Sequence, residues 1–533
     1  MAEFDLIIRS GTVFDGTGRP GFPADVGIRG DRIEAVGSLG GAVAAREIDA
    51  TGLYVAPGFI DIHTHSDWTM FGNPRMESKI RQGVTTEVAG NCGTSLAPLV
   101  GTAQESAART LARIGREPDW TTLAEYFERI EANGIAQNYA TFIGHGTLRQ
   151  AVMGFEMRPP TADELDRMKR LLAEGMEQGA LGLATGLIYP PGCYADTEEI
   201  IELAKVIAPY DGVYATHMRN EADRLLESVA EAIRIGEEAG VSVQISHHKA
   251  VGRRNWGKVN DSLELIEKAR SRGLRVDCDQ YPYIASSTNL GVVLPRWVFE
   301  GGNGKLLARL ADPDVRRRVA EEAGGEYENA ENLSRGAGWD GILIADSPRA
   351  PEYEGRTIAQ VAEAEGKDPL TVVFDLLLAN GGYVGAIFFG MCEDDVRTVM
   401  RYPHTFIGSD SSARAPYGVM GFGKPHPRTY GTFPRVLGRY VREEKVLAWE
   451  EAIARMTSKP ARKVRLRGRG ELRPGYFADI VVFDPNTVID RATFTEPHQY
   501  PAGIEYVIVN GTVVIDRGEH TGVLPGRVLR PGS

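Results

Sequence analysis

Four histidines in this sequence stand where short apolar segments end. His63 and His65 close the first such segment, and His217 and His247 each close a later one. A β-strand projects residues i and i+2 to the same side, so His63 and His65 can reach a single metal ion. This placement predicts a metal site assembled from the ends of several strands.

A cysteine stands at an equivalent position. Cys92 lies in Gly90-Asn-Cys-Gly93, where glycine allows the backbone to turn sharply and bring the sulfur close to a metal. With His217 and His247, Cys92 offers one sulfur and two nitrogen ligands and leaves a fourth position for water, which is the open coordination of a catalytic zinc site. Imidazole and thiolate donors favour Zn2+ over magnesium or calcium.

An aspartate ends another apolar segment. Asp410 lies in Ile407-Gly-Ser-Asp-Ser. A carboxylate beside metal-bound water can accept a proton as the water attacks and then deliver it to a departing amine. The alternative is a helix N-cap, because Asp-Ser-Ser is good capping chemistry. The strand-end position favours the role of general base and acid.

The remaining histidines near strand ends and the other cysteines have simpler interpretations. His145 follows the third apolar segment without an evident partner, and His248 should point away from His247 along the strand. We expect both to be structural or to lie behind the metal donors. The same structural interpretation applies to the three other thiols, Cys193, Cys278 and Cys392.

The sequence pattern predicts that alternating strands and helices position these side chains. Eight strand candidates begin at Gly58, Val84, Tyr139, Ala180, Gly212, Val241, Leu274 and Thr405. Amphipathic helices lie between several of them, for example from Glu221 to Ala239. Eight alternations predict an α/β fold of the (β/α)8 TIM-barrel type, whose active site lies at the carboxyl ends of its strands.

Two further units flank or interrupt this barrel. Residues 1–56 and 466–533 are rich in β-type runs and turn signals, including Asn510-Gly511, and predict one small β-sandwich built from both chain termini. The barrel is then expected over 57–465. The stretch 284–350, which contains a charged helix-like run from Asp312 to Glu322, is too long for an ordinary connection and predicts a lid inserted before the last barrel strand.

Bulk composition narrows the class of partner. With 533 residues, a large and a smaller domain are expected. A net charge of -12 without a sustained basic run disfavours nucleic acid and anionic membranes, which leaves a small soluble substrate. The N-terminal segment lacks a secretory pattern and no apolar run approaches the roughly 20 residues of a membrane span, so we expect a cytoplasmic protein. The sequence leaves the oligomeric state open.

The strand-end residues resemble those of the amidohydrolase superfamily, with His-Thr-His after the first strand, single histidines after the fifth and sixth, and an aspartate after the eighth. Within it, Gly90-Asn-Cys-Gly, Gly186-Leu-Ile-Tyr-Pro-Pro-Gly, Ile245-Ser-His-His-Lys and Arg428-Thr-Tyr-Gly-Thr-Phe look like the N-acyl-D-amino-acid deacylases. The match runs across essentially the whole chain. It implies zinc-dependent cleavage of the amide bond of an N-acyl-D-amino acid.

The resemblance also implies roles for particular residues. The tight zinc belongs to Cys92, His217 and His247, and a second, weaker or vacant site belongs to His63, His65 and Asp410. The substrate carboxylate needs cationic or hydroxyl partners, and Lys249, Tyr281 and Arg296 are the candidates, with Tyr189 near the scissile group. The side-chain preference stays open between acidic substrates, through Arg414 and Arg428, and apolar ones, through Phe422, Met420 and Trp297.

Two other functions compete with this one. The first is a cyclic-amide hydrolase or an isoaspartyl-type dipeptidase. Hydantoinases and many dihydroorotases place a carbamylated lysine on the fourth strand, and Gly182-Leu-Ala-Thr-Gly186 offers none. The second is a non-catalytic scaffold that keeps the barrel but loses metal ligands. This chain retains Cys92, the strand-end histidines and Asp410, which speaks against a scaffold.

Overall fold

The computed structural model describes residues 3–323 and 331–532. In this part of the chain, parallel strands at eight positions form the ring of a barrel, and they coincide with the eight predicted segments. They are β6 (Phe59–Asp61), β7 (Val84–Ala89), β8 (Asn138–Thr141) continued by β9 (Ile143–Gly144), β10 (Gly182–Gly186), β11 (Val213–His217), β12 (Ser242–Ile245), β13 (Val276–Gln280) and β17 (Thr405–Ile407). Hydrogen-bonded neighbours run β6-β7-β8 and β9-β10-β11-β12-β13-β17.

The ring closes between β6 and β17, where backbone pairing is sparse. Among the described residues, one isolated parallel bridge joins Thr64 to Ser411 just beyond these strands. The Asp61 side chain adds a second link, because Oδ1 accepts a hydrogen bond from the Ser409 backbone N–H at 2.8 Å and Oδ2 lies 2.8 Å from Lys79 Nζ. Neither Asp61 nor Lys79 exposes any side-chain surface. A buried ion pair therefore reinforces this seam.

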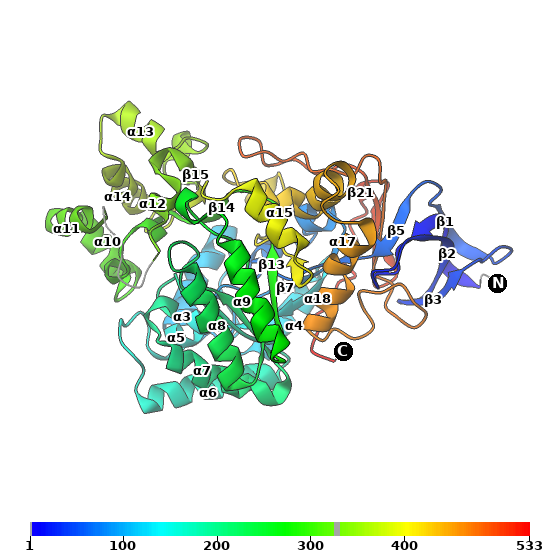
Figure 1. Ribbon diagram of the computed structural model, residues 1–533, viewed down its shortest axis with the longest axis horizontal. Helices are drawn as coiled ribbons and strands as arrows, with labels where there is room; N and C mark the ends of the chain where they lie inside the picture. The colour runs from blue at the N-terminus through cyan, green and yellow to red at the C-terminus, as the bar shows by residue number, and fades with distance from the viewer. Residues whose placement is uncertain (1–2, 324–330, 533) are drawn as a thin grey trace.

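Helices cover the outside of the ring. α6 (Ala162–Glu177), α7 (Thr197–Ile207), α8 (Leu225–Ala239) and α9 (Val259–Ser271) pack side by side against β10 to β13 (Figure 1). Their apolar faces join the largest buried cluster of the molecule. No helix in the described ranges is both long and apolar enough to cross a membrane.

α8 begins later than predicted. The expected helix from Glu221 starts only at Leu225, because the Asn220 side chain accepts hydrogen bonds from the backbone N–H groups of Ala222 and Arg224 and holds these residues in a turn. Glu221 is therefore placed in a buried loop at the carboxyl end of β11, instead of on a helix surface.

Both chain ends build one nine-stranded sheet. The N-terminal strands are β1 (Phe4–Val13), β2 (Phe22–Arg29), β3 (Arg32–Gly37), β4 (Ala44–Asp49) and β5 (Tyr54–Pro57), and the C-terminal strands are β18 (Ile480–Phe483), β19 (Ile504–Val509), β20 (Thr512–Asp516) and β21 (Glu519–His520). The order is β21-β20-β19-β18-β5-β1-β2-β3, with β4 paired to β1. β5 and β18 pair antiparallel and join the two ends. The Asn510-Gly511 turn connects β19 to β20, as the sequence predicts.

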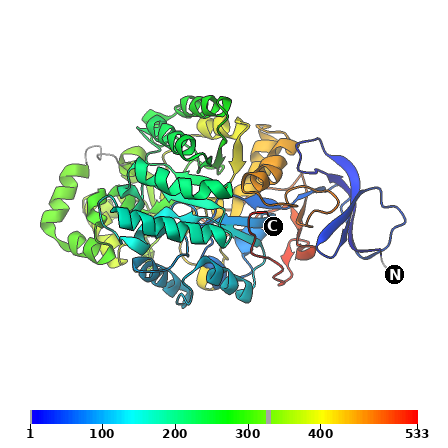
Figure 2. The same ribbon diagram turned by 90° about the horizontal axis from the view of Figure 1, so that it is seen from below.

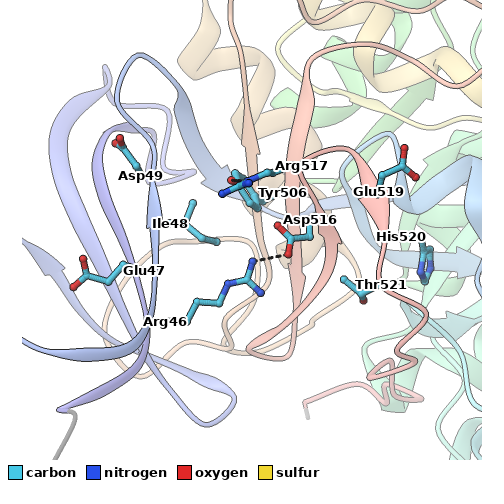
Figure 3. A pocket seen from close by; sticks show the side chains of 10 residues that line it. All are labelled: Arg46, Glu47, Ile48, Asp49, Tyr506, Asp516, Arg517, Glu519, His520 and Thr521. Atoms are coloured by element: carbon cyan, nitrogen blue, oxygen red, sulfur yellow. Dashed lines mark hydrogen bonds and ion pairs between the residues drawn. The ribbon is translucent and has the colours of Figure 1, made fainter.

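A polar cavity of about 670 Å³ lies in this terminal sheet, between β4 and β20 (Figure 3). Arg46 on β4 donates a hydrogen bond of 2.7 Å to Asp516 Oδ2 on β20. Charged side chains of both signs line the cavity, and none of the strand-end histidines, Cys92 or Asp410 takes part in it. It is therefore separate from the predicted metal site.

Between β13 and β17 the chain forms an additional unit. Its antiparallel sheet has the order β14 (Ser286–Asn289), β16 (Gly385–Phe388) and β15 (Ile342–Asp346), and helices such as α10 (Asn303–Ala311) and α14 (Pro369–Ala379) share its apolar core. The charged run from Asp312 to Glu322 forms α11 (Pro313–Ala323), as predicted. The unit extends past the expected range 284–350, because its central strand comes from residues beyond that range. Figure 2 shows this unit and the terminal sheet at opposite ends of the barrel.

Candidate metal centre

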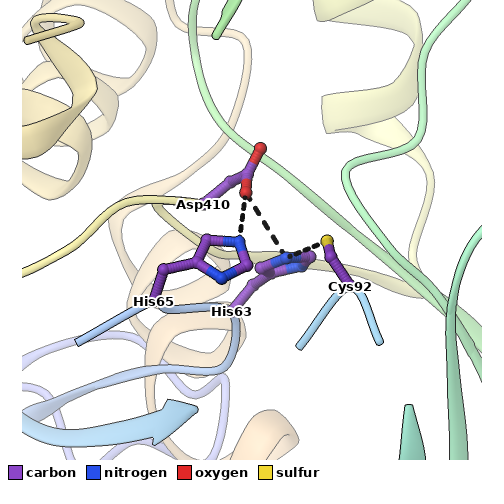
Figure 4. A group of neighbouring side chains, drawn as sticks. All are labelled: His63, His65, Cys92 and Asp410. Carbon is purple, nitrogen blue, oxygen red and sulfur yellow. Dashed lines mark hydrogen bonds and ion pairs between the residues drawn. The ribbon is translucent and has the colours of Figure 1, made fainter. Parts of the chain in front are cut away.

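The six predicted metal donors lie together at the carboxyl ends of barrel strands. His63 and His65 follow β6, Cys92 follows β7, His217 ends β11, His247 follows β12 and Asp410 follows β17. Their donor atoms form two groups, and within each group the atoms lie within 4.8 Å of one another. The groups are His63, His65, Cys92 and Asp410 (Figure 4), and Cys92, His217 and His247. Cys92 thus belongs to both groups, whereas the sequence placed it only in the second.

The sulfur of Cys92 contacts histidines of both groups. Its Sγ lies 3.3 Å from His63 Nε2 and 3.5 Å from His247 Nε2. Asp410 Oδ1 lies 3.0 Å from His65 Nε2 and 3.5 Å from His63 Nε2. The thiol is therefore placed where two neighbouring metal positions can share it.

Two buried carboxylates orient the imidazoles. Asp279 Oδ1 lies 3.1 Å from His63 Nδ1, and Glu221 Oε1 lies 2.9 Å from His247 Nδ1. A carboxylate that accepts a hydrogen bond from Nδ1–H keeps the ring proton there and leaves the Nε2 lone pair free, and in both rings Nε2 is the atom that faces Cys92. Histidines that bind metals commonly have such a carboxylate partner on the ring nitrogen that does not bind the metal.

His217 supplies a direct test of whether a metal fits. Neither of its ring nitrogens has a hydrogen-bond partner among the described residues, although the side chain is buried. Burying a polar nitrogen without a partner is costly. A metal ion held by Cys92, His247 and one ring nitrogen of His217 would give that nitrogen a partner. The combination of thiolate and imidazole is a donor set for zinc.

The backbone is bent at three of the donors. Cys92, His247 and Asp410 have φ values of 51°, 37° and 50°, in the left-handed region that residues with a side chain seldom adopt. Each such residue costs of order 1–3 kcal/mol unless its surroundings enforce it, and such positions gather at functional sites. The chain therefore turns immediately after β7, β12 and β17 and keeps these side chains over the barrel mouth.

The electrostatics favour an ionised thiol and an ionised aspartate. Burial alone would raise the pKa of the Cys92 thiol, but the charge of His63 beside it holds that pKa well below its ordinary value. Burial likewise opposes ionisation of Asp410, but the Arg428 guanidinium, 2.9 Å from Oδ2, and the charge of His247 hold its pKa well below the usual range. Asp410 is thus held in its ionised form.

A model of the amidohydrolase family matches residues 46–261 and 309–515 of the chain. The chain belongs to this family. It is 41% identical to D-aminoacylase of Alcaligenes xylosoxydans xylosoxydans, over 99% of its own length and 97% of that protein. N-acyl-D-glutamate deacylase and N-acyl-D-aspartate deacylase of the same organism are 39% and 38% identical, over 99% and 100% of this chain and 97% and 96% of theirs.

Solved structures agree with this family membership. The crystal structure of N-acyl-D-glutamate deacylase from Bordetella bronchiseptica, complexed with zinc and a phosphonate inhibitor, matches with a TM-score of 0.85 at 38% identity and covers 99% of each chain. A crystal structure of D-aminoacylase matches with a TM-score of 0.83 at 40% identity, over 99% of this chain and all of that one. This amidohydrolase thus shares the TIM-barrel fold of these deacylases, and the structural match extends over nearly the whole chain.

Two of the four predicted substrate residues, Tyr189 and Lys249, contact donors of this amidohydrolase, and a third, Tyr281, lies beside Lys249. The Tyr189 ring packs edge-on against His217, with centroids 5.0 Å apart. The Lys249 ammonium lies 2.8 Å from His247 Nδ1 and 5.8 Å from the centre of the Tyr281 ring. Arg296 instead donates hydrogen bonds to backbone carbonyls on the loop that carries Tyr189, those of Cys193 and Leu187.

The sequence did not single out Glu221, Asp279 and the contact of Arg428 with Asp410. Asp279 was visible as the last acidic residue of the seventh strand, but nothing in the sequence paired it with His63. Glu221 lies four residues after His217 and was assigned to a helix. His145 and His248 stand apart from the donors, as expected. His145 lies 2.9 Å from Glu199, and His248 lies 2.8 Å from the Ser262 hydroxyl.

Proposed function

We propose that this amidohydrolase hydrolyses the amide bond of N-acyl-D-amino acids in a zinc-dependent reaction and releases a carboxylate and a free D-amino acid. The observation that carries the proposal is the strand-end cluster centred on Cys92, in a chain that is 38–41% identical to D-aminoacylases and deacylases over nearly its whole length. In sequence, one D-hydantoinase matches over only 17% of the chain, and β10 offers no lysine, so a cyclic-amide hydrolase is less well supported.

We assign the donor residues to two metal positions. Cys92, His217 and His247 would hold the tight zinc, and His63, His65 and Asp410 would hold a second ion with Cys92 shared between them. A related D-aminoacylase structure is described as having a binuclear metal centre with one-metal activation and second-metal attenuation. When bound, zinc would polarise the substrate carbonyl and lower the pKa of a coordinated water.

Asp410 is the proposed proton carrier. Its low pKa keeps it ionised at neutral pH, so it has a lone pair for a proton, and the Arg428 guanidinium and His65 fix its two oxygens. It accepts a proton from water as the oxygen–carbon bond forms and returns that proton to the amide nitrogen as the carbon–nitrogen bond breaks. The two products are the acyl carboxylate and the D-amino acid with its free amine.

Substrate binding is assigned to Lys249, Tyr281, Tyr189 and Arg296. We further propose that the unit between β13 and β17 acts as a lid, because it carries Arg296 and a hydroxyl, that of Thr288, which donates a hydrogen bond of 3.0 Å to Tyr189. The side-chain preference stays open, because the relatives act on different D-amino acids. Of the two arginines considered for an acidic side chain, Arg428 is paired with Asp410, and Arg414 donates to the Phe422 carbonyl at 3.0 Å.

The test combines metal analysis with substrate profiling. Purified protein is assayed for bound zinc, and kcat/KM is measured for N-acetyl-D-Leu, N-acetyl-D-Met, N-acetyl-D-Glu and N-acetyl-D-Asp, with the L-isomers as controls. Hydantoins and isoaspartyl dipeptides are assayed in parallel. We expect zinc and D-selective hydrolysis of at least one N-acetyl substrate. Protein without zinc that hydrolyses nothing would favour a scaffold, and preference for a hydantoin or a dipeptide would reassign the function.

A further inference from the structure

Glu221 connects two of the proposed zinc donors to Lys249. Its Oε1 lies 2.9 Å from His247 Nδ1, its Oε2 lies 3.8 Å from His217 Nε2, and both oxygens accept hydrogen bonds of 2.7 Å from Lys249 Nζ. We propose that Glu221 is a positioning residue of the zinc site, which fixes the tautomer and orientation of His247 against competition from Lys249. The inference rests on the proposed zinc-dependent function and adds a residue to it.

The competition follows from the contacts at one nitrogen. His247 Nδ1 lies 2.8 Å from Lys249 Nζ and 2.9 Å from Glu221 Oε1. An ammonium can only donate, so a hydrogen bond from Lys249 would require a bare Nδ1 and would place the ring proton on Nε2. A carboxylate can only accept, so a hydrogen bond to Glu221 keeps the proton on Nδ1 and leaves Nε2 free as a ligand. Glu221 therefore selects the tautomer that can bind metal.

The same carboxylate offsets the charge of Lys249. The ammonium is buried and lies 2.8 Å from Nδ1 of His247, the ring whose Nε2 would hold the zinc cation. Without a counter-ion it would repel that cation at short range in a medium that screens charge poorly. Glu221 counters both the wrong tautomer of His247 and the charge of Lys249. Its Oε2 accepts a hydrogen bond from Lys249, and its Oε1 accepts hydrogen bonds from Lys249 and His247.

The structure holds Glu221 firmly in this place. Its backbone N–H donates to Glu331 Oε2 at 3.0 Å, and its carbonyl accepts from the Val251 N–H at 2.8 Å. Glu331 belongs to the unit between β13 and β17, and Val251 follows β12 shortly after Lys249. Glu221 thus fixes His247 from a loop that is itself anchored on two sides.

A matched control exists in the neighbouring βα unit. Glu199 is also a buried carboxylate that holds a buried histidine, with His145 Nε2 at 2.9 Å, and a buried cation, Arg149. Neither His145 nor Arg149 belongs to the donor groups. Glu199→Gln therefore disturbs a carboxylate of the same kind without touching a zinc donor.

The experiment measures zinc affinity by chelator competition for the wild type, Glu221→Gln and Glu199→Gln, with thermal unfolding as the check on folding. We expect Glu221→Gln to bind zinc about 10–100-fold more weakly, the usual effect of losing such a partner, and Glu199→Gln to stay within about threefold of the wild type. Saturating zinc should restore most of the kcat of Glu221→Gln. An unchanged zinc affinity in Glu221→Gln, or an equal loss in both variants, overturns the inference.

A second pair of variants covers the case in which Glu221→Gln does not fold. Glu221→Leu combined with Lys249→Met leaves no unpaired buried charge and is compared with Lys249→Met alone. We expect the double variant to bind zinc at least about tenfold more weakly, and equal affinities overturn the inference. Absence of tight zinc in the wild type would instead refute the proposed function, so the two failures are distinguishable.

Discussion

Replacing Lys79 by methionine removes the cation that reinforces the seam between β6 and β17. Lys79 comes from the short helix α2 (Glu77–Ile80), and its Nζ contacts Asp61 Oδ2 at 2.8 Å and the Ser409 hydroxyl. Methionine has a similar length and fills the same space. The substitution therefore tests the charge of Lys79 more than its volume.

The size of the effect follows from what Asp61 retains. Removing one partner of a buried ion pair costs about 3–5 kcal/mol, because the other charge stays buried without compensation. Asp61 keeps the hydrogen bond from the Ser409 N–H, so we expect a loss near the lower end, about 3 kcal/mol. With Asp61→Asn added, neither partner of this pair leaves a buried charge, and the loss should fall to about 1 kcal/mol, the value of an ordinary hydrogen bond.

The assay is urea unfolding of zinc-loaded protein, followed by circular dichroism. Lys169→Met is the control, because Lys169 pairs with Glu202 on the partly exposed outer surface at 2.6 Å. Its loss should cost less than about 1 kcal/mol. The reasoning is refuted if Lys79→Met lies within about 1 kcal/mol of the wild type, or if the double variant is no more stable than the single one.

Three further changes test the site and its surroundings. Asp410→Asn should keep the zinc of the Cys92 group but lower kcat by about 10²–10⁴-fold, and near-wild-type turnover would remove Asp410 as the proton carrier. Cys92→Ala should release zinc, and a variant with stoichiometric metal would contradict the ligand assignment. Burial raises the pKa of Glu87 from 4.5 to about 7, so this carboxyl lowers the stability of the wild type as pH rises through this window. Glu87→Gln should therefore be the more stable protein above pH 7, by about 1–3 kcal/mol, and no more stable near pH 4, as measured by urea unfolding at both pH values.

The strand-end donors could be predicted because parallel strands bring their carboxyl ends to one face. Each donor follows an apolar run, so its place along the strand is also its place in the barrel. Sharing of Cys92 between two groups could not be read in this way, because it depends on distances of 3.3 and 3.5 Å across three strands. Sequence position therefore predicts which side chains lie at the carboxyl end of the barrel. Which of them contact one another depends on how the strands pack.

Glu221 shows a second limit of sequence reasoning. Its position before an amphipathic run favoured a helix start, but the Asn220 side chain stabilises a turn there and delays the helix by four residues. A local hydrogen bond thus outweighed the periodic pattern. The end of the inserted unit was misjudged for a different reason, since β16 pairs with strands up to about 100 residues earlier in the chain.

The pairing of β5 with β18 has a consequence for synthesis of the chain on the ribosome. About 420 residues separate Pro57 from Ile480, and the barrel lies between them. At about 5–20 residues per second, the edge of β5 waits some 20–80 s for its partner. Throughout that time the N-terminal strands present an unpaired edge, which is a template for aggregation. The terminal sheet can therefore be completed only after all the metal donors of the barrel have been synthesised.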